Sequence, residues 1–393
     1  HLCDRRQRQM CIRDRVKGLL DAVGNYGWAV VLFTVILKII TLPLDFWQRF
    51  SMKKNAKMMS ELAPIMAKLD KAYANDKNKL NQEKQKLYKK HGYNMLSGCL
   101  PMIVTMTIFF VMFGGLNQCS AYVNLKVYSE LSVHYTDTLS AELSKHTEEY
   151  ESRRYDILLS GKSTAIEDYK TWLGGQGVEE SAFDAEISAA TSRISQIKAE
   201  AQAEARKAVG EFYLEAKEGF LWITNISRPD TWVESFPETA EKFTGTLTKK
   251  YREYKDEFDS ELYGEIYKGI SEQGVGYKVG DKHWNGLMIL PVLSIALSFL
   301  STFISNKTSK KKNGEEQQLD PNAAAAQSSN KVMMFVMPVI MGVFGFVYTA
   351  TFALYMVCSS LLSILFTLAM NPIIDRRIAK IESKVEKPDY RRK

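Results

Sequence analysis

The sequence predicts an all-α, polytopic membrane protein with five transmembrane helices, a cytoplasmic helical hairpin and a large, mostly helical extracytoplasmic insertion. Two observations support this class: apolar and polar residues are segregated along the chain, and the loops differ in charge. Each apolar run is about 17–21 residues long, enough for a helix to cross about 30 Å of hydrocarbon. The runs do not alternate as barrel strands would, and only helices and closed barrels satisfy their backbone in lipid. The predicted spans are residues 28–44, 96–116, 286–305, 332–348 and 350–370.

Lysine and arginine are distributed among the loops in a way that predicts orientation. Residues 45–95 hold 12 basic and 5 acidic residues, residues 306–331 hold 5 and 3, and residues 371–393 hold 8 and 4. These segments are expected in the cytoplasm, together with the C-terminus. Residues 117–285 hold 20 basic and 30 acidic residues and are expected outside.

The N-terminal residues contradict this rule because five arginines precede the first span on its expected outer side. The string MCIRDR, Met10 to Arg15, resembles a translated transposon-adapter sequence. Residues 1–15 are therefore expected to be an artefact that replaces a genuine signal or first helix, and they are excluded from the fold prediction. Residues 16–27 are expected to form an amphipathic interfacial lead-in.

The polar segments predict helices and linkers. Residues 45–95 are expected to form two helices separated at ANDKN, Ala74 to Asn78, with a basic surface and a methionine-rich face. That hairpin either packs only on itself or offers a surface to anionic headgroups or a nascent apolar peptide. Residues 180–218 predict one long helix or the second arm of a helical hairpin, and residues 239–270 a similar helical segment. Residues 306–331 predict a flexible linker, and residues 371–393 a basic tail.

Motifs for covalent or metal chemistry are absent from the sequence. It contains no H-E-x-x-H and no G-x-S-x-G, and its GGQG string, Gly174 to Gly177, lacks a following Lys-Ser. None of the five cysteines forms a C-x-x-C pair, so neither a zinc site nor a disulfide framework is supported. No catalytic residue, cofactor or metal is expected.

The first span contains a single lysine in an otherwise apolar stretch, FTVILKIITLPL, which runs from Phe33 to Leu44. A cation at the bilayer centre costs roughly 2.5–3.5 kcal/mol on insertion scales, so such a residue usually faces a partner or a watery cavity. Two interpretations stay open from this stretch alone. Lys38 either extends along the helix toward the headgroups near Leu44, or it is an inward-facing functional cation.

Further strings follow in a characteristic order. They are GCLPM (Gly98–Met102), FLWITNISRPD (Phe220–Asp230), LPVL (Leu290–Leu293), MPVI (Met337–Ile340) and ALYMVCSSLLSI (Ala353–Ile364). With FTVILKIITLPL and the basic hairpin, they resemble the YidC/Oxa family of membrane protein insertases. The resemblance covers about residues 20–117, 219–232 and 286–380, and it leaves the insertions 118–218 and 233–285 unexplained.

The resemblance implies a hydrophilic, water-filled groove that is open to the cytoplasm and to lipid. In the family's groove helix a threonine precedes an arginine by one turn and a proline follows; the matching residues are Thr34, Lys38 and Pro43. The residues expected along the groove are Lys38, Thr34, Thr105, Thr302, Tyr355 and Met356. For each hydroxyl, a hydrogen bond back to its own helix is the alternative.

The sequence also departs from the family pattern. Lys38 stands where the family has arginine, and a desolvated lysine can lose its proton whereas arginine stays charged. Thr105-Met106-Thr107 replaces a Gln-Met-Pro, and Thr349-Ala350-Thr351 replaces a Pro-Ala-Gly. Met356 stands where an aromatic residue often follows Tyr355. The positive and hydroxyl character of the groove is nevertheless retained.

The function that the resemblance implies is that of an insertase and chaperone, which moves hydrophobic segments and short polar tails of nascent proteins into the bilayer without covalent chemistry. The implied location is the bacterial inner membrane. The implied partners are nascent membrane proteins and the lipid bilayer, with the secretion translocon and the ribosome as partners of the basic loops and tail. No specific nucleic acid is expected.

Two other classes of function compete with this prediction. A secondary transporter or channel would use Lys38 as an anion site, but the spans show no inverted repeat and no paired acidic residues. A scaffold would carry its function in the acidic outer segment alone.

Overall fold

A computed structural model describes residues 23–74, 76–90, 96–149, 157–158, 163–310, 336, 339–340 and 342–382, which are mostly helical. These residues divide into two compact units. The first unit takes the described residues up to Cys119, Arg228–Thr231 and those from Leu287 onward; the second takes those in Ser120–Ser227 and Trp232–Gly286. The expected artefact at 1–15, most of the lead-in, most of the 306–331 linker and the end of the basic tail lie outside the described residues.

Helix α2, Tyr26–Ala72, opens the first unit. The side chain of Asn25 accepts hydrogen bonds from the backbone N–H groups of Gly27 and Trp28, which caps the helix. The helix continues past the predicted span end at residue 44, through Pro43 and Pro64. The change from apolar to polar residues marks a change of surroundings rather than a helix end, because the polar residues that follow contain no glycine and favour helix.

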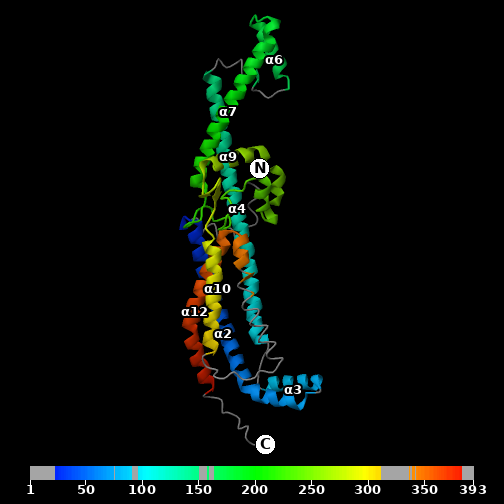
Figure 1. Cartoon of the computed structure of the whole chain (residues 1–393), viewed down its shortest axis with the longest axis vertical. Helices are drawn as coiled ribbons and strands as arrows, with labels where there is room; N and C mark the ends of the chain where they lie inside the picture. The colour runs from blue at the N-terminus through cyan, green and yellow to red at the C-terminus, as the bar shows by residue number, and fades with distance from the viewer. Residues whose placement is uncertain are drawn as a thin grey trace. The chain divides into compact units, whose positions relative to one another are not determined.

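Helix α3, Lys77–Lys90, follows α2 after a short turn in the ANDKN string. Its first turn is capped by Asp76, whose side chain accepts from the N–H of Lys79 at 3.0 Å. Lys84 Nζ lies 2.6 Å from Asp70 Oδ1 on α2, and the hydroxyl of Tyr88 donates to Met66 Sδ at 3.7 Å. These contacts hold α3 against the C-terminal part of α2 (Figure 1).

Helix α4, Leu96–Glu149, is far longer than the span predicted for residues 96–116, for the same reason as α2. Its first part belongs to the first unit. There the rings of Phe109 and Phe113 lie 6.1 and 5.1 Å from the ring of Phe352, and Phe113 lies 4.6 Å from Tyr348. Edge-on aromatic contacts therefore join α4 to the start of α12, Ala350–Glu382.

Helix α10, Ile289–Lys310, packs beside α12 (Figure 1). The oxygens of Ser298 and Ser360 lie 3.4 Å apart across this contact. Residues 342–347 are helical and approach α10 closely, because a Cβ on Gly342 would lie 2.1 Å from Ile295 Cγ1. The chain leaves that helix at Tyr348 and Thr349, and α12 begins at the next residue.

The segment Arg228–Thr231 holds the starts of both C-terminal helices. The buried carboxylate of Asp230 accepts from the N–H groups of Leu287 at 2.9 Å and Leu290 at 2.8 Å. The carbonyl of Arg228 accepts from the N–H of Ala350 at 2.8 Å. Because helix N-termini leave N–H groups without partners, these bonds fix where α10 and α12 begin.

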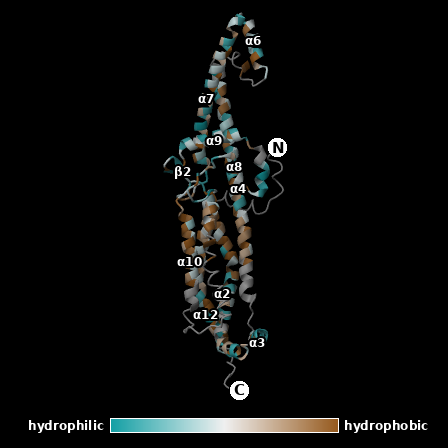
Figure 2. Ribbon diagram, turned by 45° about the vertical axis from the view of Figure 1, so that its right-hand side comes forward, coloured by the Kyte–Doolittle hydropathy of each residue, from teal (hydrophilic) through white to brown (hydrophobic). Residues whose placement is uncertain are grey.

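Three of the described helices are long and apolar enough to cross a membrane: Tyr26–Asn55, Met106–Lys145 and Ala350–Ile381. Ile289–Ile304 is a shorter apolar helix, and the fourth predicted span lies partly outside the described residues. The count of five spans therefore stays a prediction. Figure 2 shows hydrophobic residues over α10 and α12 and hydrophilic residues on α3.

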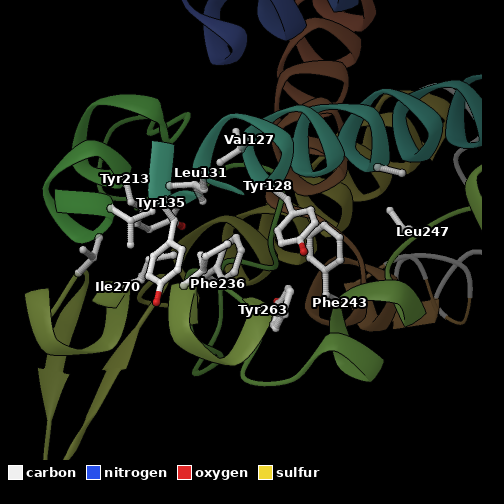
Figure 3. Close-up of a cluster of buried hydrophobic side chains, with 14 of the residues drawn as sticks. Val127, Tyr128, Leu131, Tyr135, Tyr213, Phe236, Phe243, Leu247, Tyr263 and Ile270 are labelled. Carbon is white, nitrogen blue, oxygen red and sulfur yellow. The ribbon is translucent and has the colours of Figure 1, made fainter. Parts of the chain in front are cut away.

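The second unit is built on the rest of α4 and on α7, Phe183–Ala216, which lies within the long helix predicted for 180–218. The shorter elements are α6 (Ala165–Gly175), the 3₁₀ helices η2 (Glu180–Ala182) and η3 (Lys249–Glu257), α8 (Ala240–Gly245) and α9 (Ser260–Gln273). Aromatic rings fill the core around α4 and α9, where Tyr128, Phe243 and Tyr263 lie within 5.5 Å of one another (Figure 3).

Two details of this unit differ from the sequence prediction. The helix expected over 239–270 is three separate pieces, because α8 ends at Gly245 and Asp259 caps a new helix at α9. A short antiparallel hairpin also interrupts the helical pattern, pairing β1, Tyr277–Val279, with β2, Lys282–Trp284. Its turn contains Gly280 at φ 62°, a conformation that glycine adopts without strain.

Helices α7 and α9 approach each other most closely at their crossing, where a glycine of each helix faces the other. A Cβ on Gly269 would lie 2.3 Å from the carbonyl oxygen of Arg206, and one on Gly210 would lie 2.5 Å from that of Gly269. Beside the crossing, Glu265 accepts from Arg206 at 2.7 Å and from Lys268 at 2.6 Å. Burial opposes the charge on Glu265, but these two cations outweigh it and lower the pKa of the carboxyl.

Candidate functional site

The candidate site begins with a polar stripe on the apolar first part of α2. Thr34, Lys38, Thr41 and Asp45 follow one another at spacings of four, three and four residues. Residues at these spacings lie on the same face of a helix. The stripe passes Pro43 without leaving the helix, so residues on either side of that proline share one face.

Lys38 and Asp45, the second and last residues of this stripe, form an ion pair. Lys38 Nζ lies 2.8 Å from Asp45 Oδ2, and the two side chains are 16% and 14% exposed. Such burial makes a lone charge costly, whereas a neighbouring opposite charge compensates part of that cost. The structure thus gives the mid-span lysine a partner two turns along its own helix, a partner that neither interpretation of the sequence had named.

The two threonines of the stripe bond to their own helix. Thr34, only 1% exposed, donates to the carbonyl of Val30 at 2.7 Å, and Thr41 donates to the carbonyl of Lys38 at 3.3 Å. Each hydroxyl therefore satisfies its donor locally and keeps oxygen lone pairs as acceptors. Thr34 lies one turn before Lys38 on α2, and its bond to Val30 is the alternative considered for its hydroxyl.

Helix α12 brings a second predicted residue toward the ion pair. Tyr355 is half-buried, forms a hydrogen bond with Ser359, and interacts electrostatically with Asp45. The phenol thus belongs to the surroundings of the Lys38–Asp45 pair. Met356, the next residue of α12, is also half-buried.

The other predicted residues are not brought to the ion pair by any described contact. Thr302 is half-buried on α10, about one turn beyond the Ser298–Ser360 contact with α12. Thr105 lies on α4, and its side chain is outside the described residues. The structure thus brings Lys38 and Tyr355 to Asp45, and Thr34 lies one turn before Lys38 on the same face of α2.

Toward its polar end, α2 is joined to α12 by a second ion pair. Lys53 Nζ lies 3.0 Å from Asp375 Oδ1. The guanidinium of Arg377 lies 5.7 Å from the ring centre of Phe46, a cation–π contact. These contacts join the two helices that carry Lys38 and Tyr355.

Asp45 is the member of the candidate site that the sequence analysis does not name. It follows the apolar run and falls in the predicted loop 45–95. The available signal was its spacing of seven residues from Lys38, which is two helical turns if the helix continues through Pro43. Among the described residues, no group of three or more His, Cys, Asp or Glu side chains is placed to hold a metal ion.

Apolar helices that can cross a membrane, one of them with a largely buried ion pair, define a multi-pass membrane protein. Residues 18–158 and 207–377 match the model of the family described as 60Kd inner membrane protein, and the chain belongs to that family.

Several curated relatives are named membrane protein insertase YidC. The relative from Helicobacter pylori (strain ATCC 700392 / 26695) is 43% identical over 95 residues, 24% of this chain and 17% of that protein. The relative from Fusobacterium nucleatum is 44% identical over 96 residues, 24% of this chain and 45% of that protein. The relative from Caldanaerobacter subterraneus is 40% identical over 100 residues, 25% of this chain and 47% of that protein. The chain thus matches less than half the length of each.

Proposed function

We propose that this chain is a membrane protein insertase, which accepts hydrophobic segments and short polar tails of nascent membrane proteins and passes them into the bilayer. The observation that carries the proposal is the Lys38–Asp45 ion pair inside an apolar helix, in a chain whose family includes relatives named insertases. An apolar helix that only anchored the chain would gain nothing from two charges whose burial is costly.

The polar face of α2 supplies the elements of a hydrophilic groove. Lys38 provides the cation, the hydroxyl oxygens of Thr34 and Thr41 provide acceptors, and Tyr355 adds a phenol from α12. A polar tail exchanges hydrogen bonds with water for hydrogen bonds with these groups, which lowers the cost of leaving the aqueous phase. The apolar segment that follows then enters lipid, driven by the hydrophobic effect. Thr105, Thr302 and Met356 are proposed as further groove residues.

The proposed orientation places α3, the polar part of α2 and the C-terminal tail in the cytoplasm, and the second unit outside. The charge balance of the loops supports this arrangement. The contacts of Lys84 with Asp70 and of Tyr88 with Met66 support a cytoplasmic hairpin of α2 and α3. Its exposed lysines suit contact with anionic lipid, the ribosome or the secretion translocon.

In vivo photocrosslinking tests the proposal by comparing two faces of α2. A photoreactive residue at Thr41 lies on the polar stripe, whereas one at Ile40 lies on a strongly exposed apolar face of the same turn. Position 41 should crosslink to the polar tail of a nascent membrane protein, and position 40 to its apolar segment or to lipid. An absence of nascent-chain crosslinks from both positions would reject the insertase role.

A further inference from the structure

We propose that Asp45 is an internal competitor for Lys38, which sets how acidic a substrate tail must be before Lys38 binds it. The inference rests on the proposed function and deepens it, because it assigns a specificity-determining residue to the same site. Its starting point is that the cation of the stripe already has a carboxylate partner at 2.8 Å.

A substrate carboxylate that reaches Lys38 meets this existing pair. The lysine ammonium has three donors, so a second carboxylate can approach it. Two carboxylates on one ammonium repel each other strongly where the dielectric constant is low, and both side chains of the pair are largely buried. A stable complex with an acidic tail therefore requires that Asp45 leaves Lys38.

Arg49 is a second cation with which the Asp45 carboxylate can pair. It lies one turn beyond Asp45 on α2 and interacts electrostatically with that carboxylate. Aspartate and arginine four residues apart can pair along a helix surface. Rotation of the Asp45 side chain from Lys38 toward Arg49 keeps its charge compensated while Lys38 binds the incoming carboxylate.

Selectivity follows from this exchange. A neutral tail has no carboxylate that could replace Asp45, so the Lys38–Asp45 ion pair remains intact. Such a tail binds only through hydrogen bonds of hydroxyl and backbone groups. The binding free energy that an acidic tail gains is only the difference between its own ion pair with Lys38 and the Lys38–Asp45 pair that it replaces. Asp45 thus weakens the binding of singly acidic tails and leaves tails with several acidic residues at an advantage.

The test compares wild type with Asp45→Asn in the full-length protein, using three reporter proteins whose tails carry no, one or two acidic residues. A photoreactive residue in each tail reports its crosslinking to the insertase, so the groove carries no probe. Asp45→Asn should raise the yield for the singly acidic tail on the order of fivefold, equivalent to about 1 kcal/mol, and leave the neutral tail unchanged. Asp375→Asn, which removes the Lys53 pair instead, is the matched control and should leave the acidic-to-neutral ratio as in wild type.

The outcomes separate this inference from the proposed function. If wild type captures none of the three tails, the insertase role fails. If wild type captures them but Asp45→Asn leaves the acidic-to-neutral ratio unchanged, only the competitor role fails. If the Asp45→Asn variant does not accumulate in the membrane, Arg49→Gln is the alternative test, because it removes the cation to which Asp45 would transfer. That variant should lower capture of the singly acidic tail relative to the neutral tail, and an unchanged ratio would reject the competitor role.

Discussion

Lys38 is held in an apolar helix together with its own counterion, which changes what its removal means. A change at Lys38 takes away the cation and also leaves the largely buried Asp45 unpaired. Breaking one side of a buried pair costs roughly 3–5 kcal/mol, more than the pair itself contributes. The effect of a single substitution on stability must therefore be separated from its effect on substrate.

Substitutions at Lys38 should separate charge from packing. Lys38→Arg should preserve insertion, because arginine keeps a cation beside Asp45. Lys38→Ala should reduce insertion of an acidic-tailed reporter on the order of tenfold and largely spare a neutral-tailed one, since the remaining carboxylate repels acidic tails. Lys38→Ala combined with Asp45→Asn should restore the amount of folded protein but not the preference for acidic tails. The measurement is insertion per amount of folded protein; equal insertion of acidic tails by the Ala and Lys forms would contradict the groove-cation role.

Glu265 gives a residue-scale prediction in the second unit. Glu265→Gln should cost about 1–3 kcal/mol near pH 7, because it weakens two charge-assisted hydrogen bonds at the α7–α9 crossing. The folded-state pKa of Glu265 is lowered, so its contribution is present above the unfolded pKa and is lost as the pH falls through the lower folded value. Thermal unfolding of the full chain near pH 7 and near pH 3 should show the difference from wild type shrinking in acid. Glu272→Gln, an exposed position on the same helix, is the control.

At the scale of elements, the helix contacts in the second unit depend on where small residues fall. Gly269 and Gly264 both lie in α9, yet only Gly269 meets another helix backbone, at a distance too short for a Cβ. The same substitution should therefore have opposite consequences at these two positions.

Gly269→Ala should destabilise the second unit by about 2 kcal/mol or more, because its Cβ would force α7 and α9 apart. Gly264→Ala should be neutral or stabilising by up to about 1 kcal/mol, since nothing lies within 4 Å of its Cβ and alanine favours helix. Hydrogen exchange of the α9 amides in the full chain compares the two variants. Equal protection in both would show that the close crossing does not limit stability.

The elements also show how far the sequence predicts the structure. The apolar runs 28–44, 286–305 and 350–370 fall largely within α2, α10 and α12, because burial in an apolar phase selects whole turns of helix. Helix ends were harder to predict: α2 and α4 continue into polar sequence, where tertiary contacts such as Lys84–Asp70 stabilise them. The breaks at Gly245 and Asp259 depend on packing that periodicity does not record.

The residues proposed for the site stand out in the sequence only in part. Lys38 is a lone cation in an apolar run, and Thr34 and Tyr355 lie in strings that resemble family motifs. Asp45 required the knowledge that the helix passes Pro43 unbroken, and the Lys53–Asp375 pair joins residues far apart in the chain. No single-sequence pattern pairs residues as far apart as Lys53 and Asp375.

For the whole molecule, the central prediction concerns sidedness. In a variant whose native cysteines are replaced, a cysteine at Lys86 on α3 should be shielded from an impermeant thiol reagent in intact cells. A cysteine at Ser181 or Ser260 in the second unit should be labelled. All three positions are exposed, so labelling reports membrane sidedness rather than burial. Labelling at Lys86 with protection at Ser181 would reverse the orientation and the proposed opening of the groove.

The continuity of α2 has a mechanical consequence. At 1.5 Å per residue its 47 residues extend about 70 Å, and Pro43 separates the apolar first part from the polar remainder. Pro43 leaves the carbonyl of Ile39 without its usual amide donor, so the helix bends more easily there than in its uninterrupted turns. Lys38 and Asp45 lie on opposite sides of Pro43. Bending of the helix at this proline would therefore change the distance between the two charges.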